Sequence, residues 1–174
     1  MKKTIILFLS VFVFYSCAHV KADKVDKVDK DAIKTKINAL LINWHKAASD
    51  ANFNDYFGKM DNTSIFIGTA AEEIWTKTQF ENFSKPYFDK GKAWSFETLE
   101  RTVYVNDSGD FVWFDELLTT WMGTCRGSGV LEKKDSIWKI KQYVLSVPIP
   151  NDDIQAVILA KKENDALFLK KYQK

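Results

Sequence analysis

Cysteine, histidine, proline and glycine are scarce in this chain of 174 residues, which contains 2 Cys, 2 His, 3 Pro and 7 Gly. The low glycine and proline content excludes a fibrous or low-complexity chain. The cysteines and histidines lack the spacing of a zinc site, so we expect no metal and no cofactor. The chain contains 25 basic and 23 acidic residues, so its formal net charge is only +2. A chain so nearly neutral gives no electrostatic reason to expect nucleic acid as a partner.

Aromatic side chains, by contrast, are abundant. They make up 14% of the chain, with 13 Phe and 6 Trp among them, and 46% of all residues are hydrophobic. Large rings bury much surface per residue, so a chain of this length can build a substantial core. The length fits one domain with accessory segments better than two domains.

The first 17 residues have the pattern of a secretory signal. Lys2 and Lys3 precede an apolar run from Ile5 to Tyr15, which is too short to cross a bilayer comfortably. A basic start, a short apolar stretch and small residues beyond it are typical of a signal peptide. We therefore expect an exported protein.

Two processing sites compete at the end of this signal. Phe14-Tyr15-Ser16-Cys17 resembles a bacterial lipobox, in which Cys17 becomes the lipidated first residue, although its two aromatic residues are bulkier than usual. Val20-Lys21-Ala22 offers ordinary cleavage. We prefer the lipoprotein, a bacterial cell-envelope protein that meets the membrane only through the lipid on Cys17. The alternative is a soluble periplasmic or secreted protein, cleaved at Ala22.

The segment after Cys17 has the composition of a spacer. Residues 24–30 repeat Lys, Val and Asp with alternating charge and contain little to bury. This is typical of a solvated tether near a membrane, and we assign residues 18–30 to it. The folded domain is predicted to cover residues 31–151, and a polar, helical C-terminal tail to cover residues 152–174.

Helical periodicity dominates the first half of the domain. From Asp31 onward, apolar residues recur at three- and four-residue steps and predict a core-facing helix of about five turns. They are Ile33, Ile37, Leu40, Leu41, Trp44 and Ala48. A shorter helix is predicted at 53–60 and a small strand at 64–69.

A third helix is predicted to end near a glycine at position 91. Thr76 with Gln79, or Thr78 with Glu81, has the spacing of a capping box at its start. Pro86 is expected to kink this helix or end it early, because proline lacks the helical N–H and crowds the preceding turn.

The second half of the domain has the pattern of strands, at residues 95–106, 111–121, 129–134 and 137–147, with turn residues or glycines between them. Consecutive strands with short connections make an antiparallel meander. Helices first and strands after predict an α+β fold. Gly127-Ser128-Gly129 is neither a nucleophile elbow nor a phosphate loop, and we interpret it as a bulge or tight bend.

Two of these strands are apolar on consecutive residues. Phe111-Val112-Trp113-Phe114 and Val144-Leu145 place apolar side chains on both faces of the sheet. In an antiparallel sheet with one face exposed to water, apolar and polar residues alternate along each strand instead. Helices cover one face, and a second copy of the sheet is the simplest cover for the other. We therefore expect a homodimer through the outer sheet face.

Several stretches carry a family likeness: Leu41 to Ala48, Phe66 to Thr69, Trp75 to Lys77, Trp113 to Glu116, Gly127 to Leu131 and Trp138 to Ile140. With three helices before a long meander, residues 31–151 resemble the SnoaL-like branch of the nuclear transport factor 2-like superfamily. The resemblance implies a cone-shaped fold, in which N-terminal helices pack on a curved antiparallel sheet and enclose a ligand cavity.

The same resemblance bears on activity. Members of the superfamily include isomerases, cyclases and dehydratases, but also ligand-binding domains without known chemistry, so the fold alone does not fix the function. Family enzymes often use one carboxylate or histidine in the cavity as general base. Many relatives have a histidine in the last strand just after the Trp-Lys-Ile motif. Here that position reads Lys141-Gln142-Tyr143, and glutamine cannot exchange a proton.

Three residues are candidate bases. Asp115 and Glu116 are adjacent on a strand and point to opposite faces, so one is expected to face the cavity and the other to face outward. The pattern does not fix which one. A carboxylate buried there needs a cation, and Arg101 and Arg126 are the candidates. His45, beside the apolar stripe of the first helix, is the third candidate base.

The sequence thus predicts an exported domain that binds a small organic molecule in an apolar pocket. The predicted ligand-binding residues are Trp44, Arg101, Asp115, Glu116 and Arg126. The alternative is an isomerase, cyclase or hydratase that uses Asp115, Glu116 or His45 as general base, so the question of catalysis stays open.

Overall fold

The computed structural model describes residues 28–173. In chain order it contains α1 (Lys30–Ser49), α2 (Phe53–Gly58), β1 (Met60–Ile67), β2 (Ile74–Thr76), α3 (Lys77–Asp89), β3 (Glu97–Val105), β4 (Phe111–Thr120), β5 (Gly123–Lys134), β6 (Ile137–Ser146) and α4 (Ile154–Leu169). Short 3-10 turns at Asn151–Asp153 and Lys170–Tyr172 flank α4. The predicted signal 1–17 with Cys17, the alternative cleavage site at Ala22 and residues 18–27 of the predicted tether lie outside the described residues.

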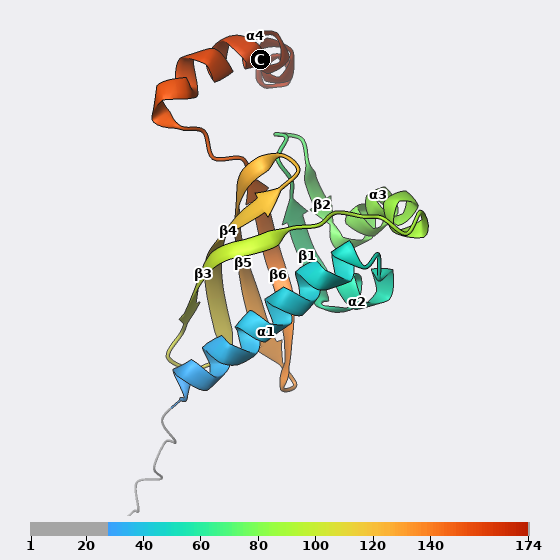
Figure 1. Ribbon diagram of the computed structural model, residues 1–174, viewed down its shortest axis with the longest axis vertical. Helices are drawn as coiled ribbons and strands as arrows, with labels where there is room; N and C mark the ends of the chain where they lie inside the picture. The colour runs from blue at the N-terminus through green and yellow to red at the C-terminus, as the bar shows by residue number, and fades with distance from the viewer. Residues whose placement is uncertain (1–27, 174) are drawn as a thin grey trace, which may run out of the picture.

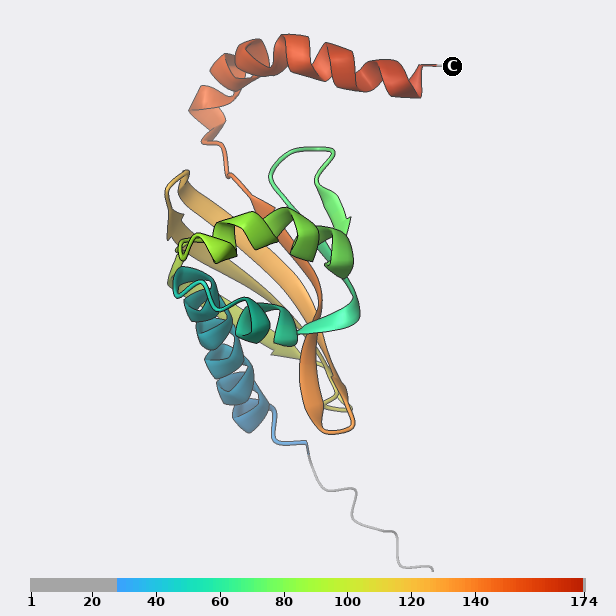
Figure 2. The same ribbon diagram turned by 90° about the vertical axis from the view of Figure 1, so that its right-hand side faces the viewer.

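The strands form one curved sheet in the order β2-β1-β6-β5-β4-β3. Its neighbouring strands are antiparallel except for β1 and β6, which run parallel. Helices α1, α2 and α3 all lie on the concave side of this sheet (Figures 1 and 2). The predicted α+β class, with N-terminal helices packed on a curved and mainly antiparallel sheet, is confirmed.

Helix α1 follows the predicted apolar stripe. The Asp29 carboxylate caps its first turn by accepting a hydrogen bond from the Ala32 amide at 3.0 Å. Ile37, Leu41 and Trp44 are buried against the sheet and the other helices. Because the next residue is also buried, α1 carries a titratable side chain, His45, into the core.

Helix α3 begins at the predicted capping box and continues past its proline. The Thr76 hydroxyl accepts from the Gln79 amide, and the Gln79 side chain accepts from the Thr76 amide. The expectation that Pro86 ends the helix early is wrong, because α3 runs on to Asp89. Pro86 is exposed, so the helical hydrogen bond that it removes lies on the side open to water.

The irregular part of the sheet is in β6 and not at the glycines. Gly127 and Gly129 pair regularly with β4, so a bulge at these positions in this ladder is wrong. Lys141 is instead an extra residue in β6, without a partner in the ladder to β5. This bulge reverses the alternation of the strand. As a result Tyr143 is buried and Gln142 is exposed.

Helix α4 stands apart from this core. It follows Pro148 and Pro150 after β6, and none of its residues is buried. Both ribbon views show it beyond one end of the sheet, away from the other helices (Figures 1 and 2). No helix within residues 28–173 is long and apolar enough to cross a bilayer.

Candidate functional site

Glu116 is an acidic side chain at the centre of the core. It lies on β4, where every second residue faces the helices, and it is only 1% exposed. Its neighbour Asp115 is exposed on the outer face of the sheet. The alternation of the strand therefore separates the two carboxylates and determines which of them faces inward.

Four hydrogen bonds occupy the Glu116 carboxylate. Its Oε2 accepts from Nε of Arg101 at 2.9 Å and from Nη2 of the same residue at 2.6 Å. Its Oε1 accepts from Oη of Tyr143 at 2.9 Å and from Nε2 of His45 at 2.8 Å. Arg101 and Glu116 are direct partners in the β3–β4 ladder, so the register of the sheet sets the ion pair. We call these four residues the Glu116 network.

The network keeps the carboxylate charged and the phenol neutral. Burial raises the pKa of Glu116, but the hydrogen bond from His45 and the guanidinium of Arg101 outweigh burial, so this pKa lies below its ordinary value. Burial, followed by the charge of Glu116, raises the pKa of Tyr143 well above its ordinary value. Glu116 is thus an anion with both oxygens in use, and it is poorly suited to take a proton from a ligand.

Gly127 makes room for this arrangement. It stands opposite Glu116 in the β4–β5 ladder. A Cβ atom at this position would overlap Oη of Tyr143 and would lie 2.9 Å from Cγ of Glu116. Only glycine therefore allows the phenol to reach the carboxylate across β5.

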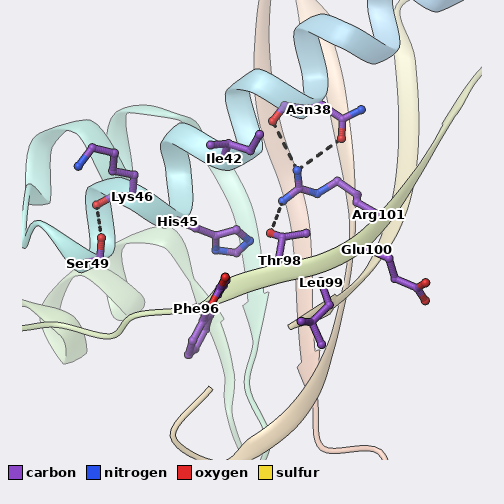
Figure 3. Close-up of a pocket in the computed structure, with 11 residues that line it drawn as sticks. Asn38, Ile42, His45, Lys46, Ser49, Phe96, Thr98, Leu99, Glu100 and Arg101 are labelled. Atoms are coloured by element: carbon purple, nitrogen blue, oxygen red, sulfur yellow. Dashed lines mark hydrogen bonds between the residues drawn. The ribbon is translucent and has the colours of Figure 1, made fainter. Parts of the chain in front are cut away.

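A groove between α1 and β3 opens beside the network. Its volume is ≈ 570 Å³, and its lining includes Asn38, Ile42, His45, Phe96, Thr98 and Arg101. Figure 3 shows His45 from α1 and Thr98 and Arg101 from β3 converging in this groove. Nη2 of Arg101 donates to Oγ1 of Thr98 at 3.0 Å, and Nη1 makes only long contacts of 3.4 Å to Asn38. We call this hollow the α1–β3 groove.

His45 presents its second nitrogen on the groove side of the network. A carboxylate only accepts hydrogen bonds, so Nε2 of His45 carries the hydrogen that Glu116 receives. Nδ1 has no hydrogen-bond partner among residues 28–173. In the neutral imidazole, Nδ1 is therefore a lone-pair acceptor at the wall of the groove, held in place by a buried carboxylate.

A second, apolar hollow lies at the end of the sheet near the β4–β5 turn. Its volume is ≈ 160 Å³, and its lining includes Phe66, Trp75, Phe80, Phe83, Trp94, Phe96, Trp121, Met122 and Leu145. The rings are layered, with Trp75 4.8 Å from Phe83 and 5.5 Å from Phe80 between centroids. Trp121 is 82% exposed. We call this hollow the aromatic recess; Phe96 also lines the α1–β3 groove.

The structure separates the five predicted ligand-binding residues into two groups. Trp44, Arg101 and Glu116 lie inside, and Trp44 stacks on Tyr56 at 4.9 Å between centroids. Its indole N–H is buried without a partner among the described residues. Asp115 and Arg126 are exposed on the outer face of the sheet. Of the five, only Arg101 lines one of the two hollows described above, the α1–β3 groove.

Several residues of the site were not candidates from sequence, among them Tyr143, Gly127 and Phe96. Tyr143 faces inward only because of the Lys141 bulge, which leaves no plain sequence signal. The role of Gly127 depends on the pairing of β4 with β5, although a glycine inside a strand is itself a signal of close approach. Phe96 lies just before β3, and its apolar character alone does not distinguish a site residue from a core residue.

Comparison with solved structures defines the class of fold. An NTF2-like protein of unknown function from Pseudomonas putida KT2440 has a TM-score of 0.59 at 14% identity, with 70% of this chain and 90% of that chain covered. An NTF2-like protein from Cytophaga hutchinsonii has a TM-score of 0.57 at 15% identity, covering 66% and 98%. The association domain of C. elegans CaMKII has a TM-score of 0.56 at 19% identity, covering 67% and 97%. The chain has the nuclear transport factor 2-like fold.

Comparison of sequences identifies the family within this class. The SnoaL-like domain model matches residues 37–150. The chain belongs to the SnoaL-like family, and the resemblance noted in the sequence is confirmed. No curated protein matches the chain.

Proposed function

We propose that this chain binds a small, largely apolar molecule with an aromatic ring in the aromatic recess. The observation that carries the proposal is the exposed Trp121 beside layered rings. A ligand that covers these rings removes much apolar surface from water. The recess of ≈ 160 Å³ is smaller than the roughly 300–1,000 Å³ of typical ligand sites. It therefore suits one ring, or the ring end of a longer molecule.

Quenching of tryptophan fluorescence by a panel of small aromatic compounds tests this proposal. Trp121→Ala is expected to weaken binding about tenfold, which corresponds to about 1.4 kcal/mol. The matched control is Trp113→Ala, which removes an exposed tryptophan from the outer sheet face. Equal affinities for both variants and the unchanged protein would exclude the recess as the site.

A catalytic role is the second candidate function, and the position of His45 supports it. Of the three candidate bases, Glu116 has both oxygens occupied and Asp115 lies on the outer face, so we assign the role of base to His45. Its Nδ1 would take a proton, while Nη1 of Arg101 and the Thr98 hydroxyl face the same groove. This arrangement suits proton abstraction next to a carbonyl, as in an isomerase.

Deuterium uptake by a simple ketone, such as cyclohexanone, tests the catalytic proposal by proton NMR. Catalysed uptake is expected to disappear in His45→Gln and to persist in Lys46→Gln, which changes the neighbouring residue on the groove wall. Uptake at the same rate without protein would leave binding as the better proposal.

We also propose that two copies pair through the outer sheet face. Tyr104 and Trp113 are exposed there and stack at 5.6 Å between centroids with an angle of 10°. A flat aromatic pair on an open sheet is a suitable dimer contact. Light scattering at micromolar concentration is expected to give the mass of a dimer, and Trp113→Lys to give a monomer. A monomeric unchanged protein would remove the proposal.

We further propose that the chain is exported to the bacterial cell envelope and lipidated at Cys17. The basic start and the short apolar run support export, and the lipobox-like stretch supports the lipid. Labelling cells with an alkyne fatty acid is expected to mark the protein, and Cys17→Ala to abolish the label. An unlabelled protein that begins after Ala22 would favour the soluble periplasmic or secreted form.

A further inference from the structure

Helix α4 is an apolar element without a partner in the described chain. It has 16 residues, and none of them is buried. Leu159 alone is 73% exposed. An isolated helix of this length is only marginally stable in water, and helices in proteins owe most of their stability to packing of an apolar face. Helix α4 therefore requires a surface to pack against.

One side of α4 forms the wall of a groove. Lys161, Asn164 and Phe168 form one wall, and the opposite wall contains Ile67 from the end of β1, Glu72 from the β1–β2 loop and Ile74 from the start of β2. The volume between these walls is ≈ 760 Å³. Within the helical wall, Lys161 and Asp165 pair with each other at 3.4 Å. We call this hollow the α4 groove.

Another side of α4 forms an apolar ridge. At about 100° per residue, Leu159 falls on the side of the helix turned away from the groove-lining residues, and Ile158 and Leu169 fall between Leu159 and Asp165. All three aliphatic residues are exposed. Lys162 lies among them on this side. We call Ile158, Leu159, Leu169 and Lys162 the α4 ridge.

The ridge and the groove are complementary. The ridge carries aliphatic side chains and one positive charge, and the groove offers aliphatic side chains and the acidic Glu72. One chain cannot bring the two together, because α4 forms the wall of the groove with its other side.

We infer that α4 is a contact element for a second copy of this chain, in which the ridge of each copy packs into the α4 groove of the other. In a pair related by a two-fold axis, the α4 ridge and the α4 groove of both copies are covered at the same time, as in isologous interfaces. Figure 2 shows the C-terminal end of α4 projecting past the rest of the molecule on the side opposite α1. This inference rests on the proposed pairing of two copies and adds a contact separate from the outer sheet face.

Sedimentation of the full chain over a range of micromolar concentrations tests the inference. Leu159→Asp is expected to raise the dissociation constant of the dimer at least tenfold. Because α4 has no buried residue, this variant keeps the fold, which the thermal midpoint checks. The matched control is Ala156→Asp, which adds the same charge to the same helix outside the ridge and is expected to leave the constant unchanged.

A charge exchange tests the contact between copies directly. The Lys162→Glu variant alone and the Glu72→Lys variant alone are each expected to be monomeric. Each variant would place like charges at both contacts of its own homodimer. An equal mixture of the two variants is expected to form dimers again, because a mixed pair brings opposite charges together at both contacts. A mixture that stays monomeric while the unchanged protein is dimeric would overturn the inference.

The remaining outcomes separate this contact from the other proposals. If the Trp113→Lys variant is monomeric and the Leu159→Asp variant remains dimeric, the sheet contact stands and the α4 contact is overturned. The reverse result supports the α4 contact and removes the sheet contact. If Leu159→Asp remains a dimer but releases an aromatic ligand faster, α4 is a lid on its own recess and the inference is overturned. Ligand affinity in the same variants tests the recess independently.

Discussion

Gly127 faces Glu116 across the β4–β5 ladder, and the space of its missing Cβ is where Oη of Tyr143 meets the carboxylate. Gly127→Ala is therefore expected to lower the free energy of unfolding by about 1–3 kcal/mol, as overpacking of a core does. Denaturant unfolding measures the change. The matched control is Gly58→Ala, where no atom of residues 28–173 lies within 4 Å of the added Cβ and no loss is expected. An equal loss at both positions would refute the steric explanation.

Removal of the Tyr143 hydroxyl tests its bond to the carboxylate. Tyr143→Phe deletes a donor to a buried anion, and such bonds contribute about 1.5–3 kcal/mol to the free energy of unfolding. Tyr104→Phe, on the outer face, is expected to stay within about 0.5 kcal/mol. The cost of Gly127→Ala is expected to be smaller in Tyr143→Phe, because the atom that the new Cβ meets first is gone. Fully additive costs would mean that the two positions are independent.

Neighbouring residues on β4 give a matched pair for the buried charge. Glu116→Gln keeps the shape of the side chain but leaves Arg101, with a side chain 4% exposed, without its counter-ion. Breaking a buried pair in this way costs about 3–5 kcal/mol. Asp115→Asn makes the same chemical change one residue away in water and is expected to cost less than about 0.5 kcal/mol. Similar losses for both variants would mean that the network contributes little.

The pH dependence of unfolding follows from the same carboxylate. The pKa of Glu116 is lower in the folded protein than in the unfolded chain, where it is about 4.3. Its contribution to stability is therefore complete above that value and is lost as pH falls toward the folded pKa. The difference in unfolding free energy between the unchanged protein and Glu116→Gln is expected to shrink below pH of about 4. A difference independent of pH between 2.5 and 6 would contradict the depressed pKa.

Local sequence rules were sufficient for most of the fold. The apolar stripe of α1, the capping box of α3 and the turn residues between strands each act within a few residues, so the sequence predicts them directly. The separation of Asp115 from Glu116 follows in the same way from the period of a strand. Helix α3 continues past Pro86, because the exposed position of this proline lowers the cost of the missing helical hydrogen bond.

The centre of the site depends on register, and register is not local. The Lys141 bulge turns Tyr143 inward and Gln142 outward, so the last strand supplies a phenol where plain alternation would give an amide. Whether Arg101 or Arg126 pairs with Glu116 likewise depends on which strand face each occupies. Strand β2 was not predicted, because its three residues are too few to show the alternation of apolar and polar residues.

The geometry of the guanidinium, and not its charge alone, is expected to hold the network together. Arg101 donates from two nitrogens to Oε2 of Glu116 and from Nη2 to Thr98, and a lysine ammonium cannot reproduce this fork. Arg101→Lys is therefore expected to reduce the free energy of unfolding by about 1–3 kcal/mol despite the retained charge, because buried acceptors lose donors. Arg126→Lys, on the exposed outer face, is the matched control and is expected to stay within about 0.5 kcal/mol. Equal stability of the two variants, measured by denaturant unfolding, would show that a positive charge anywhere near the carboxylate is enough.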